Sequence, residues 1–329
     1  MPAYPIVYLL VILLLLQGCA TPYVQPVSSQ ASEPALHETF ARMDDGYRLP
    51  LTTWSTAGEQ RVILLAVHGL NDYRKAFSTT GDYLAARGIS VIAYDQRGFG
   101  NSSGQGLWHG SDRLTADLRL MINLLRRDYP GLPLYLLGES MGGAVVLAAA
   151  GKAPLDVDGT ILVAPAVWSR GSMPIYQRAA LWLAAHLIPG RKLTGEGLDL
   201  HPSDNIDMLR ALGRDPLVIK ATRVDVLYGV SNLMDQAVKS GDTLGEKMLF
   251  LYGKHDDIVP HAPTCRWLRS LPTTNHNLRQ ILIYENGYHM LTRDLQAEVV
   301  LEDIAQWITA AGRVSFGRPD LIPLASFCP

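Results

Sequence analysis

The sequence predicts an α/β fold in which helices cover both faces of a mainly parallel sheet. Six short apolar runs rich in branched residues recur along the chain, as strands buried on both faces require. Helical patterns alternate with these runs, and strands that alternate with helices pair in parallel. Of the 329 residues, 48% are hydrophobic and 18% are charged, which provides enough apolar material for a sizeable core.

The individual elements follow from the period of the apolar residues. The expected strands of the parallel sheet are residues 62–67, 89–94, 134–137, 160–163, 248–251 and 281–284. The expected helices are residues 78–87, 114–127, 141–151, 262–271 and 295–311. Ahead of them, residues 38–43 and 47–54 flank an Asp-Gly pair that suits the positive φ of a hairpin turn, so we expect an antiparallel hairpin there.

The alternation is interrupted between residues 167 and 245, where no strand signal occurs. Helical stretches at 175–187 and 224–238 are separated there by turns rich in Pro and Gly. An interval of this length is better explained as a helical cap than as a loop. The expected division is therefore a core at 37–166, a cap at 167–245, a second core part at 246–312 and a C-terminal tail at 313–329.

A candidate nucleophile, Ser140, follows the expected strand at 134–137. It lies in the pattern G-x-S-x-G formed with Gly138 and Gly142, between an apolar strand and a helix rich in Ala. Small residues are needed around such a sharp turn because a β-carbon would clash with the adjacent backbone. The helix dipole and the N–H of Met141 would stabilise negative charge on a substrate oxygen.

A Ser hydroxyl needs a base and a carboxylate that orients the base. In sheets of this kind these groups follow the carboxyl ends of strands, and Asp256 and His289 do so in the order Ser, Asp, His. Asp257 is the fallback for the carboxylate. The loop after residue 67 would supply a second oxyanion donor, the N–H of Leu70, and His68 in that loop is interpreted as structural.

These motifs together resemble the α/β-hydrolase family of monoacylglycerol lipases and lysophospholipases, over about residues 38–311. The resemblance implies a catalytic triad of Ser140, Asp256 and His289, with the N–H groups of Leu70 and Met141 forming the oxyanion hole. It implies a serine hydrolase that cleaves carboxylic esters of acyl lipids. Asn71 departs from the pattern, because the family often has a second Gly there.

Two alternatives remain open. One is a serine aminopeptidase of the same superfamily, which usually carries Gly-Gly-Ser-Trp around the nucleophile, whereas this chain has Gly-Glu-Ser-Met-Gly-Gly. The other is a lipid-binding envelope protein that has kept the fold without turnover. Apolar residues of the cap would line an acyl channel or pack the cap onto the sheet. These residues are Trp168, Met173, Tyr176, Leu181, Trp182, Leu183 and Leu187.

The N-terminus carries a targeting signal. Residues 6–16 are wholly apolar but shorter than the roughly 20 residues that span a bilayer, and they lead into Cys19. The segment resembles a bacterial lipoprotein signal at 1–18, in which Cys19 becomes the lipidated first residue. Ala20 then indicates the outer membrane, with the enzyme facing the periplasm. An uncleaved anchor or an ordinary signal peptide are the alternatives, and residues 19–36 read as a flexible tether.

Composition excludes other classes of function. A net charge of −2, a pI near 6.5 and the lack of a basic run argue against nucleic acid as a partner. The nine His residues are scattered, so no metal is expected, and no cofactor is implied. Cys265 and Cys328 would be able to pair in an oxidising envelope, but we expect Cys265 to be a buried free thiol. The oligomeric state is left open.

Overall fold

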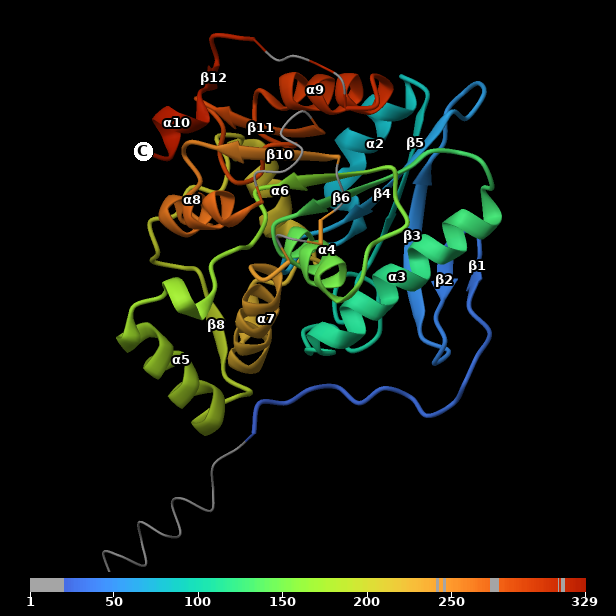
Figure 1. Cartoon of the computed structure of the whole chain (residues 1–329). Helices are drawn as coiled ribbons and strands as arrows, with labels where there is room; N and C mark the ends of the chain where they lie inside the picture. Colours follow the sequence, from blue (N-terminus) through green and yellow to red (C-terminus); the bar gives the residue numbers. More distant parts are fainter. Residues whose placement is uncertain (1–20, 241–242, 245–246, 273–277, 313, 315–316) are drawn as a thin grey trace, which may run out of the picture.

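A ten-stranded sheet organises the fold, in the order β1-β2-β3-β5-β4-β6-β7-β10-β11-β12 (Figure 1). The computed structural model describes residues 21–240, 243–244, 247–272, 278–312, 314 and 317–329. All pairings from β5 to β11 are parallel, whereas those among β1, β2, β3 and β5, and that of β11 with β12, are antiparallel. The predicted α/β class and the hairpin are therefore confirmed.

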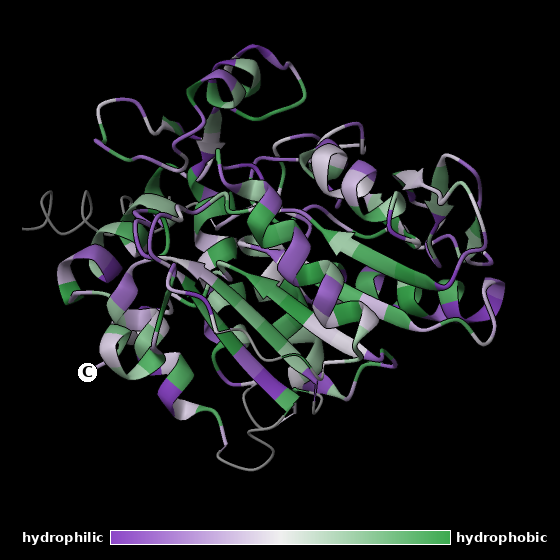
Figure 2. Cartoon of the chain, turned by 90° about the horizontal axis from the view of Figure 1, so that it is seen from above, coloured by the Kyte–Doolittle hydropathy of each residue, from purple (hydrophilic) through white to green (hydrophobic). Residues whose placement is uncertain are grey.

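The strands of this sheet coincide closely with the apolar runs of the sequence. Their bounds are β1 (Ala35–Leu36), β2 (Phe40–Arg42), β3 (Arg48–Trp54), β4 (Val62–Val67), β5 (Ile89–Tyr94), β6 (Leu134–Glu139), β7 (Gly159–Val163), β10 (Met248–Gly253), β11 (Arg279–Tyr284) and β12 (Leu321–Ile322). In Figure 2 the strands form a hydrophobic layer between the helices. Buried apolar residues on both faces explain why these runs lack a polar alternation.

Helices cover the two faces of the sheet. They are α2 (Ser78–Ala85), preceded by the short helix η1 (Arg74–Phe77), α3 (Ser111–Asp128), α4 (Met141–Lys152), α8 (His261–Ser270) and α9 (Ala297–Thr309). The sheet has a hydrophobic core on each face, and successive residues of β4 belong to different cores. Leu64 belongs to the core with α2 and α9, and Leu65 to the core with α3, α4 and α8. The helices were predicted from sequence with small differences at their ends.

The insertion between β7 and β10 forms a cap on the carboxyl side of the sheet. It contains η2 (Arg170–Ser172), α5 (Ile175–Leu187), β8 (Lys192–Thr194), α6 (Ile206–Arg214), β9 (Ala221–Arg223) and α7 (Val224–Ala237). The expectation that this interval lacks strands is wrong, because β8 and β9 form an antiparallel pair. All residues of β8 are exposed, so the strand has no apolar pattern to reveal it. Helix α6 was also not predicted.

The described part of the expected tether lies against the domain. Residues 21–34 form no helix or strand, but the N–H of Gln25 donates to the carbonyl of Trp108 over 2.7 Å and that of Ser32 to Asp44 over 2.7 Å. β1 follows directly, inside the segment expected to be flexible. The predicted signal at residues 1–18 and Cys19 lie outside the described residues. Among the described residues, no helix is both long and apolar enough to cross a bilayer.

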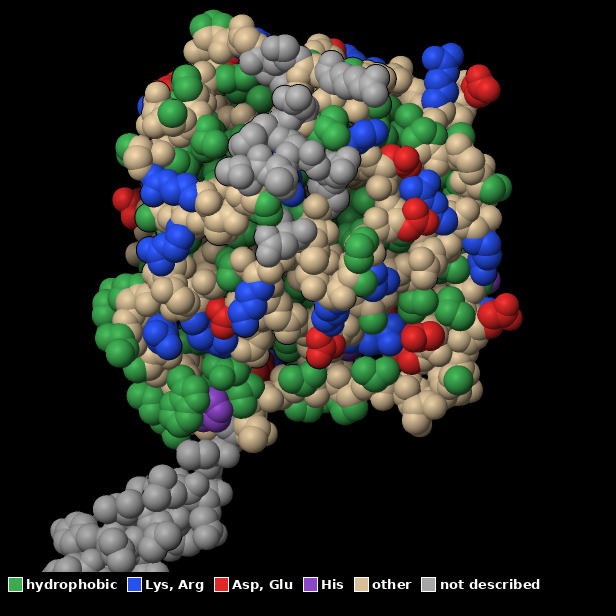
Figure 3. Space-filling view, in the orientation of Figure 1, with side chains coloured by type: hydrophobic (Ala, Val, Ile, Leu, Met, Phe, Trp, Pro, Cys, Tyr) green, Lys and Arg blue, Asp and Glu red, His purple; other side chains and the backbone are tan. Residues whose placement is uncertain are grey.

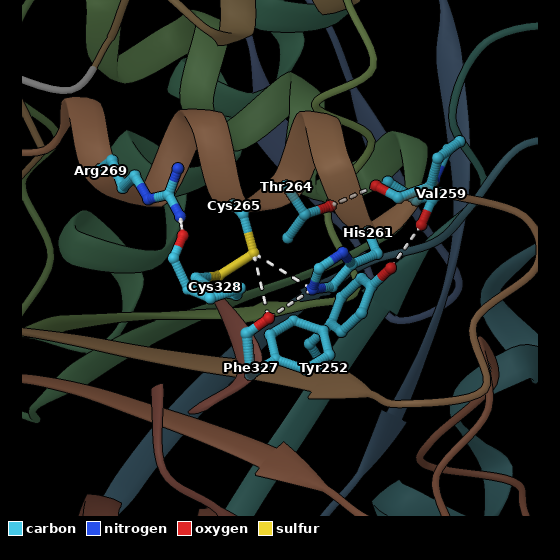
Figure 4. The surroundings of a disulfide bond; sticks show 10 residues. Tyr252, Val259, His261, Thr264, Cys265, Arg269, Phe327 and Cys328 are labelled. Carbon is cyan, nitrogen blue, oxygen red and sulfur yellow. Dashed lines mark hydrogen bonds between the residues drawn. A yellow bond between two sulfur atoms is a disulfide. The ribbon is translucent and has the colours of Figure 1, made fainter. Parts of the chain in front are cut away.

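The C-terminal tail folds back onto the domain (Figure 4). β12 pairs with β11, and the short helix α10 (Leu324–Phe327) brings Cys328 to α8, where it forms a disulfide with Cys265. The expectation of a free thiol at Cys265 is therefore wrong. The ring of Phe327 packs against His261 and Tyr252, which holds the tail beside the start of α8 and places the two sulfurs together.

Candidate active site

Ser140 occupies the sharp turn that joins β6 to α4. Its backbone has φ 53° and ψ −117°, a conformation that L residues rarely adopt. A β-carbon on Gly142 would lie 2.0 Å from the carbonyl oxygen of Val67. A β-carbon on Gly138 would lie 2.7 Å from Gly143 Cα. Glycine is thus required on both sides of Ser140, as the sequence pattern predicts.

Asp256 and His289 are joined by a hydrogen bond beyond the ends of β10 and β11. His289 Nδ1 lies 2.8 Å from Asp256 Oδ2. The second carboxylate oxygen, Asp256 Oδ1, accepts hydrogen bonds from the N–H groups of Ile258 at 2.8 Å and Val259 at 2.9 Å. The side chain of Asp257, the fallback for this role, is 48% exposed. The structure therefore brings Asp256, not Asp257, to the histidine.

The surroundings of His289 favour its protonated form. Burial lowers the pKa of His289, but the charge of Asp256 and the hydrogen bond to it outweigh burial, so the pKa is raised above its ordinary value. Glu139 raises this pKa further and Arg293 lowers it. In the neutral tautomer that donates Nδ1–H to Asp256, Nε2 carries the lone pair and is able to accept a proton.

A cavity of about 550 Å³ lies between the sheet and the cap, and both Ser140 and His289 line it. Leu70 and Met141, the residues expected to donate oxyanion hydrogen bonds, line the same cavity. The cap contributes an apolar wall. Its residues there are Trp168, Met173, Leu181, Leu227, Val230 and Met234. The predicted serine, histidine and oxyanion residues are thus brought to one cavity.

The cap residues considered for an acyl channel divide into two groups. Trp168, Met173 and Leu181 line the cavity. The remaining four face solvent, with exposed fractions of 49% or more, so their assignment to a channel wall or to packing on the sheet is wrong. These four are Tyr176, Trp182, Leu183 and Leu187. Helix α5 touches the domain along one side only, and an almost continuously apolar helix does not reveal from sequence which side that is.

The loop after β4 is held in place by His68 and Asn71. The buried ring of His68 accepts a hydrogen bond at Nε2 from the N–H of Gln96 over 3.0 Å, and Nδ1 lies 2.8 Å from the carbonyl oxygen of Gly69. Burial lowers the pKa of His68, which keeps it neutral and structural, as expected. A β-carbon on Gly69 would lie 3.2 Å from Ser140 Cβ, so this loop passes directly beside the serine.

Asn71, at the position where the family often has a second Gly, has a backbone conformation that suits glycine. Its φ is 66°, in the left-handed region that Asn tolerates better than most residues. Its side-chain amide donates to Thr222 Oγ1 over 2.6 Å, and its carbonyl accepts from the N–H of Ile219 over 2.9 Å. Both contacts reach the cap, so Asn71 joins the oxyanion loop to the cap.

The sequence matches the model of a known protein family. The Hydrolase_4 family, described as serine aminopeptidase, S33, matches residues 58–296, well over half of the sequence. The chain belongs to this family. The α/β-hydrolase resemblance derived from the motifs is therefore confirmed.

Proteins similar in sequence to this chain are named as monoacylglycerol or monoglyceride lipases. A monoacylglycerol lipase from Mycolicibacterium smegmatis is 26% identical over 297 residues, which cover 86% of this chain and 99% of that protein. The monoglyceride lipase of Homo sapiens is 25% identical over 276 residues, covering 80% of this chain and 88% of that protein.

Solved structures show the same fold. The monoacylglycerol lipase of Paleococcus ferrophilus has a TM-score of 0.67 at 24% identity and covers 80% of this chain and 99% of its own. A soluble variant of monoglyceride lipase from Saccharomyces cerevisiae, in complex with a substrate analog, has a TM-score of 0.68 at 21% identity and covers 90% and 100%.

Three charged residues of the site were not identified from the sequence. Arg293 Nη1 donates to Asp72 Oδ2 over 2.7 Å, and Arg293 Nη2 donates to Glu139 Oε1 over 2.8 Å. All three line the cavity. Asp72 and Glu139 come shortly after the ends of predicted strands, and Arg293 comes shortly after His289. A charged residue at such a position is the signal that would have identified these three residues.

Three residues whose side chains are of metal-ligating types lie together where the C-terminal tail meets α8. Among the described residues, the ligand atoms of His261, Cys265 and Cys328 all lie within 4.8 Å of one another. The disulfide joins the two sulfurs, so in this state the group has no thiolate to offer a metal.

Proposed function

We propose that the protein is a serine hydrolase that cleaves carboxylic esters of acyl lipids. The observation that carries this proposal is the shared cavity: Ser140, strained at the turn before α4, lines it together with His289, which is hydrogen-bonded to Asp256. The names of the relatives support an ester of a monoacylglycerol type as substrate. The triad assignment rests on this geometry and on the chain order Ser, Asp, His.

The proposed reaction proceeds through an acyl-enzyme. Ser140 Oγ attacks the ester carbonyl carbon while His289 Nε2 accepts the hydroxyl proton, and Asp256 stabilises the imidazolium. The N–H groups of Leu70 and Met141 would donate to the oxyanion. Collapse of the intermediate breaks the bond to the alcohol, which leaves with the proton from His289. Water, deprotonated by His289, then attacks the acyl-enzyme and releases the fatty acid and Ser140.

The residues that line the cavity suggest the form of the substrate. The cap side is lined by apolar side chains, including Trp168, Met173 and Leu181, which would take up an acyl chain. Asn71 lines the same cavity, and its polar side chain suits a small polar head. We therefore propose a monoacylglycerol or a lysophospholipid as the substrate class.

The aminopeptidase alternative, which the family description names, is less compatible with this cavity. An aminopeptidase needs an acidic group for the substrate amine. Among the described residues that line the cavity, the carboxylates are Asp72 and Glu139, and both pair with Arg293. Rates measured with nitrophenyl and glycerol esters of increasing chain length, compared with aminoacyl arylamides, separate the two activities. A preference for the arylamides over all esters would favour the peptidase.

A fluorophosphonate probe tests whether the serine is reactive at all. We expect the folded wild-type protein to be labelled at Ser140, because an activated serine attacks the phosphorus of the probe. The variant Ser140→Ala, with the same circular dichroism spectrum, serves as the control. A folded wild-type protein that is not labelled at Ser140 would support the alternative of a lipid-binding envelope protein without turnover.

We further propose that Cys19 carries lipid and anchors the enzyme to the outer membrane on the periplasmic side. Residues 24–27 share a surface groove with Asn232 and Asp235 of α7. Val24 comes five residues after Cys19, so the anchor would lie at most roughly 18 Å from this groove beside the cap. Figure 3 shows hydrophobic side chains gathered over α5. They include the exposed Ile175, Tyr176, Trp182, Leu183, Leu187 and Ile188.

Metabolic labelling with a radioactive fatty acid tests the anchor. Two or more acyl chains hold a protein stably on a bilayer, because each buried CH₂ contributes about 0.8 kcal/mol. Wild type should incorporate the label and fractionate with the outer membrane, and Cys19→Ser should do neither while its esterase activity per folded molecule stays unchanged. Wild type without label would mean that Cys19 is an ordinary residue of an exported or otherwise anchored protein.

A further inference from the structure

Three segments of the site meet at the side chain of Arg293. Its guanidinium bridges Asp72, in the loop after β4, and Glu139, the last residue of β6. Arg293 itself belongs to the loop after β11. Thr292 Oγ1 adds a longer hydrogen bond of 3.3 Å to the second oxygen of Glu139. One side chain therefore joins segments that are more than 150 residues apart in sequence.

Each of the three charged residues is close in sequence to a proposed catalytic or oxyanion-hole residue. Asp72 comes two residues after Leu70, and Glu139 comes directly before Ser140. Arg293 comes four residues after His289. The exposed fractions of the three charged side chains are 8% for Arg293, 9% for Asp72 and 3% for Glu139. Charges so deeply buried are retained only when they are paired and hydrogen-bonded.

We propose that Arg293 is a positioning residue that fixes the oxyanion loop, the Ser140 turn and the His289 loop relative to one another, and that the charge of Glu139 stabilises the imidazolium of His289. This inference rests on the proposed function. A planar guanidinium with fixed donor directions is able to hold two carboxylates at once, which an ammonium group does less well. The network thus sets distances on which the proton transfer from Ser140 depends.

The electrostatic part follows from the charges around His289. Asp256 and Glu139 raise the pKa of this histidine, and Arg293 lowers it. Asp72 pairs with the other terminal nitrogen of the same guanidinium, Nη1, and Asp294 accepts a hydrogen bond from the N–H of Tyr288. With two carboxylates on one guanidinium, the network has an excess negative charge. When His289 accepts the proton of Ser140, the new positive charge is therefore stabilised.

Glu139→Gln isolates the charge from the packing. The amide has nearly the same shape, its oxygen is able to accept from Arg293, and its nitrogen is able to donate to Thr292. We expect the His289 imidazole to titrate at lower pH in the variant than in wild type, when followed by NMR in protein labelled at the histidine rings. The acid limb of kcat/KM should move to lower pH with it. This NMR titration needs no turnover.

Arg293→Lys isolates the fork geometry from the charge. We expect kcat to fall by roughly 10- to 100-fold with little change in KM, because a small misplacement of the reacting groups slows the chemical step more than binding. The rate of fluorophosphonate labelling at Ser140 should fall in parallel. A loss of folding is monitored by thermal unfolding of each variant.

Matched controls come from two other buried networks. Arg97 also bridges two carboxylates, those of Asp45 and Asp117, and Arg97→Lys should lower stability without changing kcat. Asp303 is a buried partner of Arg318, and Asp303→Asn should leave the titration of His289 where it is in wild type. These controls separate a loss of structure from a loss of positioning.

The outcomes distinguish this inference from the proposed function. An unchanged or upward-shifted titration of His289 in Glu139→Gln would overturn the electrostatic role. Wild-type kcat and labelling rate in Arg293→Lys would overturn the positioning role. Wild-type protein that hydrolyses no ester would instead refute the proposed function, while the NMR titration would still decide the role of Glu139.

Discussion

Gly142, in the helix that follows Ser140, lies directly against the carbonyl group of Val67 at the end of β4. There is no space for a side chain at this position. A β-carbon at this position would lie 2.0 Å from that oxygen. Since the oxyanion loop begins directly after Val67, this contact sets the separation between Ser140 and Leu70. The glycine is therefore a spacer between the two sides of the site.

Gly142→Ala should consequently damage both stability and activity. We expect the free energy of unfolding to fall by about 1–3 kcal/mol, because backbone must shift to admit the methyl group. Esterase activity per folded molecule should fall with it. Gly213→Ala is the matched control, because no atom lies within 4 Å of a β-carbon there and alanine favours a helix. Equal stability of the two variants in urea unfolding would show that the contact is not tight.

The pH dependence of activity should report His289. The base acts in its neutral form, and its pKa is raised above the ordinary value near 6.5. Activity should therefore be lost as the pH falls through a pKa above about 6.5. A kcat/KM profile with its acid limb clearly below this value would contradict the assignment of the base.

Asp256→Asn tests the partner of that base. The variant removes the charge that raises the pKa of His289 and disturbs the tautomer that donates Nδ1–H to residue 256. We expect a loss of roughly a thousandfold or more in kcat. Asp257→Asn, at the exposed neighbouring position, should retain nearly full activity. The opposite result in the two variants would reverse the assignment of the carboxylate.

Sequence reasoning succeeded where the signal is local. The turn at Ser140 is visible because Gly138 and Gly142 are needed within one bend, and Asp256 and His289 stand out because each follows an apolar strand. Arg293 was not identified because its partner Glu139 is 154 residues away in sequence. The sequence around a charged residue does not indicate which distant residue it will pair with. The same holds for the disulfide, which spans 63 residues.

The cap was the least predictable part for a related physical reason. Helix α5 is apolar on nearly every side, so its sequence does not separate Leu181, which lines the cavity, from Leu183, which is exposed. The short strand β8 has only exposed residues and pairs with β9 in a two-stranded sheet. The positions of such elements depend on tertiary contacts, which the periodicity of apolar residues does not indicate.

The stability of the His289 loop should depend on Asp294. Its carboxylate accepts hydrogen bonds from Ser203 Oγ at 2.6 Å and from the N–H of Tyr288 at 2.9 Å, yet burial outweighs these bonds and raises its pKa to about 6. The folded state therefore binds this proton more tightly than the unfolded state. Stability from this group is present below about pH 4 and is lost as the pH rises through about 6.

Asp294→Asn removes that dependence. Relative to wild type, the variant should gain stability by up to about 2 kcal/mol between about pH 4 and pH 7, because only wild type loses the bound proton over this range. Urea unfolding at several pH values measures the difference. A stability difference that stays constant with pH would mean that Asp294 has the same pKa in the folded and the unfolded chain.

The disulfide should stabilise the domain without taking part in catalysis. It closes a loop across 63 residues, for which chain entropy gives a stabilisation of about 4 kcal/mol. The double variant Cys265→Ser and Cys328→Ser should therefore unfold at lower temperature but hydrolyse esters normally while folded. Thermal unfolding with and without a thiol reductant gives the same comparison in wild type. An unaffected unfolding temperature in both experiments would contradict this stabilising role.

The central claim is that ester hydrolysis depends on Ser140, and the most direct measurement compares wild type with Ser140→Ala. Both proteins are purified, shown to share the same unfolding temperature, and assayed on a long-chain monoacylglycerol and on a short nitrophenyl ester. We predict that the variant retains its fold and loses at least roughly a thousandfold of kcat/KM on both substrates. A Ser140→Ala protein that hydrolyses these esters as fast as wild type would contradict the account.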